Sequence, residues 1–408
     1  MAALKTLASL LPKVAVYTGM ILGTAIGQNV LLQNDLKGTI AIHDPSTILK
    51  ENGTYYVWGS HGSSLMSKDR KTWTNGAASP ATSQPWWAAH GGELWAPEVH
   101  YMNGFYYCYY SVSAWMDFNS AIGVTRSPTL DPSASNYKWT DLGMVIDSAE
   151  AQDGGKTRVN VIDPGAVADS DGKHYLIFGS FQGGVRMAEL NPATGLLKNK
   201  PSHPTVITSS AGEGSGAIQV GSYYYYAISE GKCCKDMSST YHMDYARATK
   251  ITGPYTTKSG ASFVNKNSEL LLSGSNNSTA TTGAVAVGVG GFFWDGNSLL
   301  DTLFMDYMAY TAPSGGALLN IQPLYQDATG WLTFDKSKGT IITRPASTTT
   351  VYSRTESSHP VNRIGLLARV NGMERQDPSQ ALYSLTGQKV SGAIKSLPAG
   401  IYLAKPLP

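Results

Sequence analysis

Short runs of aromatic and aliphatic residues recur along the chain, each directly after a glycine turn. The runs are "NGTYYVWGS" from Asn52, "NGFYYCYYS" from Asn103, "DGKHYLIFGS" from Asp171, "VGSYYYYAIS" from Val220 and the weaker "DGNSLLDTLFMDYMAY" from Asp295. In the first three, Asn-Gly or Asp-Gly precedes the run, and both residues of such a pair adopt positive φ at low cost. Each run is therefore predicted to be the second strand of a β-hairpin.

The spacing of these runs indicates the architecture. They begin about 50 to 75 residues apart, which is enough for a four-stranded antiparallel sheet with its loops. A β-sandwich with tyrosine-rich strands is the alternative, but a sandwich gives no reason for a repeat of such long period. We therefore predict an all-β protein, a five-bladed β-propeller with one blade for each run.

Composition and charge agree with this interpretation and exclude some partners. The chain has 23 tyrosines and 43 glycines but only 15% charged residues, which suits strands joined by tight turns better than helices. A net charge of +2, without a lysine or arginine cluster, argues against a nucleic-acid partner. The three cysteines form neither a disulfide framework nor a zinc-binding spacing.

The first residues have the features of an export signal. Lys5 precedes a mainly apolar stretch, and the small residues Ala25 and Gly27 are placed as at a signal-peptidase site. An anchoring helix is the alternative, but Pro12 and Lys13 leave an apolar run of roughly 14 residues, whereas a bilayer needs about 20. We expect a signal peptide at residues 1–27, no membrane span, and a secreted or cell-surface protein.

Acidic residues stand shortly before some of the repeated strands. They are Asp44 in "IHDPS", Asp163 in "NVIDPGAVAD" and Glu213 in "GEGSGAI". One Asp-Pro pair alone is more often an ordinary turn, but three acids in register with the repeat should meet at one mouth of the central channel. Glycoside hydrolysis needs a carboxylic acid and a second carboxylate, and a third carboxylate can raise the pKa of the acid. The pattern therefore predicts a glycosidase site.

Longer motifs support this prediction. They are "HDPS", "LWAPEVHYMNGFYYCYYSVSAW", "NSAIGVTRS", "NVIDPGAVADSDGKHYLIFGSFQGGVRMAEL", "CCKDMSSTYHMDYARATKITGPY" and "IQPLYQDATGW". In this order they resemble glycoside hydrolase family 43, and within it the endo-1,5-α-L-arabinanases. The resemblance covers about residues 38–345. It implies a five-bladed propeller, an inverting mechanism and arabinan, a plant cell-wall polysaccharide, as the substrate.

The resemblance also implies roles for single residues. Asp44 matches the general base, Asp163 the carboxylate that raises the pKa of the acid and orients it, and Glu213 the general acid, although Ser215 stands where proline is usual. The base and acid carboxylates should be roughly 6.5 to 9.5 Å apart, to leave room for a water. The expected substrate-contacting residues are His43, Trp95, Asn119, Asn160, Ser180 and Phe181.

Two further features concern cysteine and metal. Cys233 and Cys234 match a pair that recurs in arabinanases, either as a vicinal disulfide or as thiols. Arabinanases often hold an axial calcium ion near a histidine of the fifth blade, but here "GAVAVGVGGFFWDG" has Val289 near that place. We therefore assign no metal ligand and no required cofactor. An axial calcium would have to be held by carbonyl groups and waters alone.

The C-terminal part of the chain differs in amino-acid composition from the rest. Residues 346–365 are predicted to be a Ser/Thr-rich linker after a catalytic domain at residues 28–345. Residues 366–408 read as short strands with glycine turns and resemble the C-terminal sorting modules of some secreted bacterial proteins. An additional edge hairpin on the propeller is the alternative interpretation.

The leading hypothesis is an enzyme that cleaves internal α-1,5 bonds of arabinan and acts as a monomer. An exo-acting α-L-arabinofuranosidase or β-xylosidase of the same fold would have the same acids and differ only in its loops. A propeller that binds glycan without cleaving it is a third possibility, supported by Val289 and by the sequence around Glu213. A protein-interaction propeller would not need convergent carboxylates.

Overall fold

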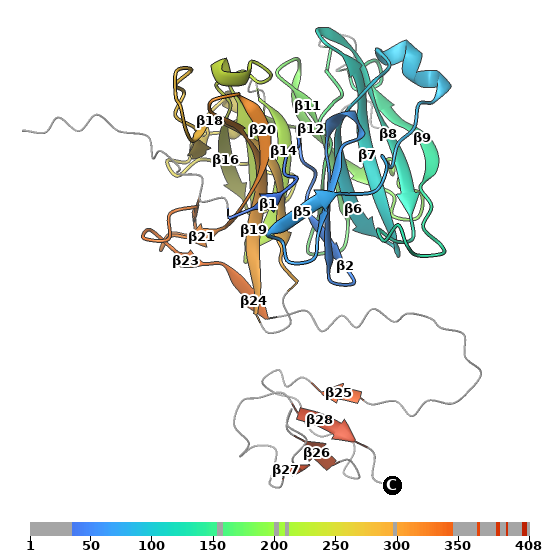
Figure 1. Ribbon diagram of the computed structural model, residues 1–408, viewed down its shortest axis with the longest axis vertical. Helices are drawn as coiled ribbons and strands as arrows, with labels where there is room; N and C mark the ends of the chain where they lie inside the picture. The colour runs from blue at the N-terminus through green and yellow to red at the C-terminus, as the bar shows by residue number, and fades with distance from the viewer. Residues whose placement is uncertain are drawn as a thin grey trace, which may run out of the picture. The chain divides into compact units, whose positions relative to one another are not determined.

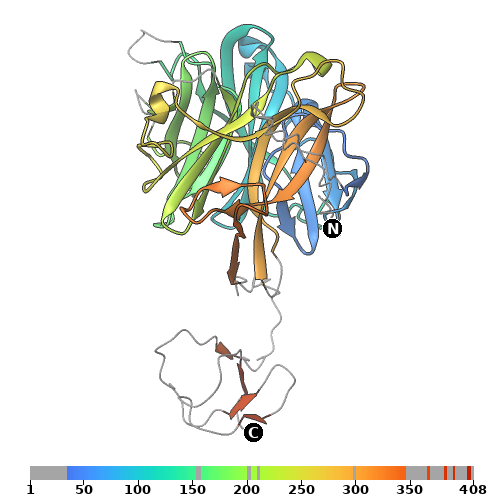
Figure 2. The same cartoon turned by 90° about the vertical axis from the view of Figure 1, so that its left-hand side faces the viewer.

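The computed structural model describes residues 35–152, 158–199, 204–208, 212–296 and 300–345, and four short strands between residues 365 and 405. The described residues between 35 and 345 form a five-bladed β-propeller, in which each blade is one sheet and the sheets surround a common axis (Figure 1, Figure 2). The predicted fold is thereby confirmed. The expected signal peptide, residues 1–27, lies outside the described residues.

From its inner to its outer strand each blade follows the chain order, except that the first strand of the chain is added at the outer edge of blade 1. Blade 1 consists of β2 (Leu49–Glu51), β3 (Thr54–Trp58), β4 (Ser64–Ser67), β5 (Thr72–Asn75) and β1 (Lys37–Gly38), which pairs with β5 in parallel. Blade 2 consists of β6 (Glu93–Met102), β7 (Phe105–Ala114), β8 (Asp117–Ser127) and β9 (Thr140–Asp147). Blade 3 consists of β10 (Gly165–Ala168), β11 (His174–Ser180), β12 (Gly184–Leu190) and β13 (Thr205–Thr208).

The remaining strands complete the ring. Blade 4 consists of β14 (Glu213–Val220), β15 (Tyr223–Glu230), β16 (His242–Ala248) and β17 (Glu269–Ser273), and blade 5 of β18 (Ala284–Trp294), β19 (Leu300–Thr311) and β20 (Gly316–Pro323). The chain then forms a small sheet from β21 (Tyr325–Gln326), β22 (Leu332–Thr333) and β23 (Thr340–Ile341), while β24 (Thr343–Pro345) pairs with β19. Short 3-10 helices are η1 (Ser60–Gly62), η2 (Pro85–His90), η3 (Asp236–Ser238) and η4 (Phe263–Asn265).

The repeated aromatic runs are the second strands of the five blades, as predicted. Their side chains are buried on both faces, because alternate residues point toward the two neighbouring blades. In β3, Tyr55 and Val57 pack in a cluster with Phe293 of blade 5, whereas Tyr56 and Trp58 pack in another cluster with residues of blade 2. Burial on both faces explains why these runs lack the polar alternation of a half-exposed strand.

The start of the chain closes the ring. Ile42 N donates to Ala317 O at 3.2 Å and Leu319 N donates to Ile40 O at 2.8 Å, so the segment before blade 1 pairs with β20 of blade 5. In Figure 1 the blue start of the propeller accordingly lies beside the orange strands of blade 5. Ile42 and Leu319 are both buried in the cluster that joins blades 5 and 1.

One detail of the hairpin prediction is wrong. Asn52 and Asn103, with the glycine after each, have positive φ as expected for a two-residue turn. In the third copy only Gly172 of the Asp171-Gly172 pair has positive φ, at 76°. There the turn is longer, because Asp169 N donates to Lys173 O and Gly172 N donates to Asp169 O.

The chain divides into two compact units, Met1–Ser347 and Thr348–Pro408. In the second unit, β25 (Gly365–Leu367), β26 (Ala381–Tyr383), β27 (Lys389–Val390) and β28 (Tyr402–Lys405) form one sheet in the order β25-β28-β26-β27. The predicted domain boundaries, and the interpretation of this unit as a sorting module, stay predictions. Among the described residues no helix is long and apolar enough to cross a bilayer.

Shortening Leu319 should weaken ring closure. Its side chain is fully buried between blades 5 and 1, so Leu319→Ala should lower the free energy of unfolding by about 2 to 5 kcal/mol. Leu300→Ala is the matched control, because Leu300 is 52% exposed and its loss should change stability by less than about 0.5 kcal/mol. Urea unfolding followed by tryptophan fluorescence measures both. Equal losses would contradict the role of this interface.

Candidate active site

A cleft of about 710 Å³ opens at the mouth of the propeller. Its walls come from blades 1 to 4, and the predicted acids Asp44, Asp163 and Glu213 all line it. They come together because each stands at or shortly before the first strand of its blade: β2, β10 and β14. The convergence predicted from the sequence is therefore present.

Asp44 is held by its neighbours in blade 1. Its Oδ2 accepts hydrogen bonds from His43 Nδ1 at 2.7 Å and from Ser60 Oγ at 2.5 Å. The other ring nitrogen of His43 lies 2.8 Å from the hydroxyl of Tyr310. His43 is thus fixed between two partners and orients Asp44.

Asp44 and Asp163 share an unusual backbone conformation. Each precedes a proline and has positive φ, 49° for Asp44 and 53° for Asp163. Non-glycine residues rarely adopt this region, and such strain is typical of functional sites. Surrounding contacts hold it in place: Asp163 N donates to the buried Ser111 Oγ at 2.9 Å, and Ser60 N donates to His43 O at 2.9 Å.

Glu213 and Asp163 lie on adjacent blades and are linked through the next residue. Gly214 N donates to Asp163 Oδ2 at 3.1 Å. Glu213 Oε1 accepts a hydrogen bond from the hydroxyl of Tyr241, the residue before β16. One side chain oxygen of each acid is therefore held by blade 4.

The environment separates the pKa values of the three acids. Burial alone would raise the pKa of Asp44, but the charge and hydrogen bond of His43, with that of Ser60, lower it overall. Burial raises the pKa of Asp163 well above its usual range, and the charges of Glu213 and Asp44 add to the effect. Burial also raises the pKa of Glu213, against the hydrogen bond from Tyr241. Acids shifted in opposite directions are typical of a paired base and acid.

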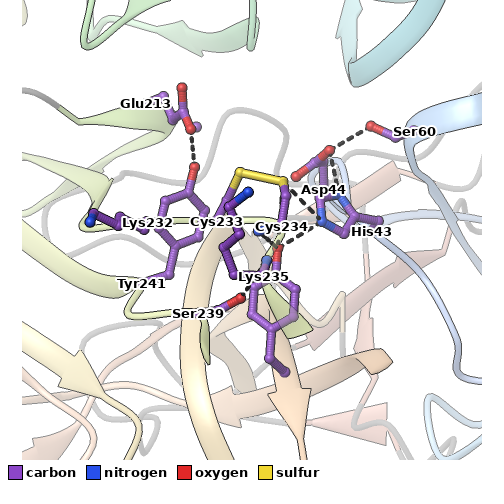
Figure 3. The surroundings of a disulfide bond; sticks show 12 residues. His43, Asp44, Ser60, Glu213, Lys232, Cys233, Cys234, Lys235, Ser239 and Tyr241 are labelled. Atoms are coloured by element: carbon purple, nitrogen blue, oxygen red, sulfur yellow. Dashed lines mark hydrogen bonds and ion pairs between the residues drawn. A yellow bond between two sulfur atoms is a disulfide. The ribbon is translucent and has the colours of Figure 1, made fainter. Parts of the chain in front are cut away.

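Cys233 and Cys234 form a vicinal disulfide in the wall of the cleft, which decides between the two states left open by the sequence. Figure 3 shows it with Glu213 and Tyr241 on one side and His43 and Asp44 on the other. Cys234 N donates to the Tyr310 hydroxyl at 3.0 Å, and Cys234 Sγ lies 3.9 Å from His43 Nε2. The disulfide loop therefore touches the residues that hold Asp44.

The predicted substrate-contacting residues divide into two groups. His43, Trp95, Asn160 and Phe181 line the cleft. Trp95 Nε1 donates to Glu93 Oε2 at 2.9 Å, and Phe181 is 46% exposed. An exposed aromatic ring in a cleft is a suitable surface for the apolar face of a sugar.

Asn119 and Ser180 lie outside the lining of the cleft, contrary to expectation. Asn119 Nδ2 donates to Ala89 O at 2.5 Å and so holds the end of η2. Ser180 is fully buried and accepts a hydrogen bond from Asn160 Nδ2 at 2.9 Å. These positions give both residues a supporting role, because neither side chain reaches the cleft.

Other cleft residues were missed by sequence reasoning. Tyr241 contacts Glu213, and Trp115, at the tip of the β7–β8 hairpin, is 58% exposed in the cleft. Lys235 Nζ lies 5.5 Å from the centre of the Trp115 ring, so loops of blades 2 and 4 meet. Tyr241 lies within a motif that was recognised, "STYHMDY", but one tyrosine among 23 gives no signal of its own.

A second, smaller cavity of about 30 Å³ lies on the propeller axis, since all five blades contribute to its wall. Its carboxylates already accept hydrogen bonds; Glu98, for example, accepts them from Thr47 N at 2.9 Å and Thr47 Oγ1 at 2.8 Å. Burial raises the pKa of Glu98 to about 7 in spite of these bonds. Val289, which lines the same cavity, is buried with Phe292 in an apolar cluster. These residues do not fit an axial ion anchored by an imidazole.

Comparisons with known proteins agree with this geometry. The model of glycosyl hydrolases family 43 matches residues 38–286. The chain is 32% identical to the extracellular exo-α-(1→5)-L-arabinofuranosidase ArbA of Cellvibrio japonicus, covering 73% of this chain and 88% of that protein. It is 34% identical to the extracellular endo-α-(1→5)-L-arabinanase 1 of Bacillus subtilis, covering 58% of this chain and 73% of that protein.

A solved structure shows the same similarity. The α-L-arabinanase of Cellvibrio cellulosa complexed with arabinohexaose superimposes with a TM-score of 0.63 at 29% identity, covering 74% of this chain and 99% of that chain. The family model covers more than half of the chain, and it spans the segments that carry Asp44, Asp163 and Glu213. The protein is therefore a glycoside hydrolase and belongs to glycosyl hydrolases family 43.

Proposed function

We propose that the protein hydrolyses the α-1,5 bonds of arabinan by an inverting mechanism and cleaves inside the chain. The observation that carries this proposal is the meeting of three carboxylates in one cleft, with the pKa lowered at Asp44 and raised at Glu213 and Asp163. The names of the similar proteins support the choice of substrate, since they act on α-1,5-linked arabinose or bind arabinohexaose.

In this mechanism Asp44 is the general base. The bonds from His43 and Ser60 both fall on Oδ2 and favour the ionised form. Among the described residues they leave Oδ1 to accept a proton from the attacking water. His43 keeps the carboxylate in the orientation that this transfer needs.

Glu213 is the general acid and protonates the leaving oxygen. The raised pKa of Glu213 keeps it protonated at a pH where an ordinary glutamic acid is ionised. Asp163 shares the buried environment, and the charge of Glu213 adds to burial in raising the pKa of Asp163. Together the two carboxyl groups retain a proton that can be delivered to the bond.

Exo action is a second candidate, favoured by one contact. The β7–β8 hairpin and the disulfide loop meet at Trp115 and Lys235 although blades 2 and 4 are not neighbours. A bridge of this kind can restrict the cleft to a chain end, and one similar protein is named an exo-acting enzyme. We favour internal cleavage because the cleft is large and has exposed aromatic rings such as Trp115 and Phe181.

We further propose that the enzyme acts outside the cell. Two similar proteins are named extracellular, and the sequence of residues 1–27 is that expected of an export signal. Arabinan is a plant cell-wall polymer, so an enzyme outside the cell would have access to it.

The catalytic roles are tested with linear arabinan. Asp44→Asn and Glu213→Gln should each lower kcat by about 10²- to 10⁴-fold, because each removes one proton-transfer group. On an aryl arabino-oligosaccharide with a good leaving group, Glu213→Gln should recover much of its rate and Asp44→Asn should not. Glu189→Gln, a surface carboxylate paired with Lys198, is the control. Wild-type rates in both variants would reject the assignment, and proton NMR of the first product should show inversion.

Product sizes decide between internal and terminal cleavage. The wild type should release oligomers of several lengths from linear arabinan early in the reaction, measured by size-resolved chromatography. A single small product from the first minutes would establish exo action. In that case Trp115→Ala should broaden the product range, because it removes the ring that meets Lys235.

The pH profile should respond separately to two hydroxyl groups. Activity requires Asp44 to be ionised and Glu213 to be protonated. Ser60→Ala removes a bond that lowers the pKa of Asp44, so the acid limb of kcat/KM should move to higher pH. Tyr241→Phe removes a bond that lowers the pKa of Glu213, so the alkaline limb should move to higher pH. Movement of the opposite limb in either variant would reverse the two roles.

A further inference from the structure

A mixed cluster of Glu230, His242 and Asp244 lies in blade 4, outside the residues that line the cleft. Glu230 ends β15 and pairs directly with His242, the first residue of β16. Asp244 follows two positions later, so the three side chains share one face of the sheet. Tyr241, which precedes His242, and Met243, which lies between His242 and Asp244, belong to the opposite face. From there the hydroxyl of Tyr241 contacts Glu213.

The spacing of the donor atoms suits a single small cation. One ligand atom from each residue lies within 4.8 Å of the others. His242 Nε2 and Asp244 Oδ1 are 3.8 Å apart, too far for a hydrogen bond. Two ligands about 2.1 Å from a zinc ion are roughly 3.4 Å apart in a tetrahedral arrangement. A small rotation of the half-buried Glu230 brings the third donor to that distance.

The imidazole is already oriented as a ligand. His242 Nδ1 donates a hydrogen bond to Thr240 O at 3.2 Å. The lone pair of the neutral ring is then on Nε2, directed at Asp244. A backbone carbonyl on the other ring nitrogen is the usual arrangement behind a metal-binding histidine.

Asp244 has a carboxylate oxygen without a hydrogen-bond partner. Its Oδ2 accepts a hydrogen bond from Ser268 Oγ at 2.5 Å, but the buried Oδ1 has no hydrogen bond within the described part of the chain. The residue is 8% exposed, so an unpaired oxygen here is costly. A cation between the three groups would satisfy this oxygen and neutralise the two carboxylates.

We propose that Glu230, His242 and Asp244 bind one divalent transition-metal ion of the zinc class, with water completing its coordination. The donor set of one imidazole and two carboxylates suits zinc better than calcium, which prefers oxygen ligands alone. The site is separate from the catalytic acids and from the axial cavity.

The position of the ion has a consequence for the cleft. Glu230 and His242 are the two ends of the loop that contributes Lys232, Lys235 and the vicinal disulfide to the cleft wall. The ion would join these ends and hold Tyr241, next to His242, in register with Glu213. It would thereby stabilise the loop without taking part in the reaction.

The proposal is tested with the full chain, without a polyhistidine tag and freed of metal by chelator. Titration with zinc chloride, followed by isothermal titration calorimetry, should show one site with a one-to-one stoichiometry. Zinc should also raise the melting temperature. Glu230→Gln and His242→Gln should each weaken binding at least tenfold and abolish the rise in melting temperature.

Two controls separate this site from others that could bind zinc. Glu189→Gln removes a surface carboxylate of blade 3, and Glu213→Gln removes one from the cleft; both should leave zinc binding unchanged. The melting temperature of each variant without metal shows that it is folded. Absence of zinc binding in the wild type, or binding that Glu230→Gln and His242→Gln leave intact, would overturn the proposal.

Discussion

The burial of both faces of each second strand is the constraint on which the rest of the molecule depends. A strand such as β3 supplies side chains to two interfaces at once, with Val57 turned toward blade 5 and Trp58 toward blade 2. No blade can be stable alone, because its apolar surface is covered only by its neighbours. A closed ring is the arrangement that covers every such face. It also fixes the positions of the inner strands, and with them the acids that precede these strands.

The chemistry follows from that rigid frame. Asp44 and Asp163 hold a backbone conformation that a flexible loop would not keep, and contacts from the blades stabilise it. The same frame gives the three buried acids different surroundings. Asp44 receives hydrogen bonds that favour its ionised form, while Glu213 and Asp163 share a site where two negative charges would repel each other. Acid and base are thus distinguished by surroundings, although all three groups are carboxyls.

Much of this could be predicted from the sequence, for identifiable reasons. The hairpin period gave the number of blades, and the Asp-Pro pairs marked Asp44 and Asp163 because proline leaves a trace in sequence. Contacts between distant segments leave none. Tyr241 and Trp115 reach the cleft only through the geometry of loops, and Asn119 and Ser180 are turned away from it by packing that no local pattern records. The turn at Asp171 shows that the same dipeptide can adopt another turn when the neighbouring Asp169 offers a hydrogen bond.

Ring closure by the segment around Ile42 has a consequence for how the chain reaches its native state. This segment is among the first parts of the propeller to be synthesised, but its partner strand β20 is among the last. The two segments are separated in sequence by nearly the whole propeller. Contacts of such long sequence separation slow folding, because the entropy cost of closing the loop precedes the free energy gained from the contact. Until then, the apolar edges of blades 1 and 5 stay open to association with other chains. The ring can therefore close only after β20 has been synthesised. A chain truncated within the fifth blade would lose that blade and would also leave the segment around Ile42 and the facing side of blade 1 without their partners.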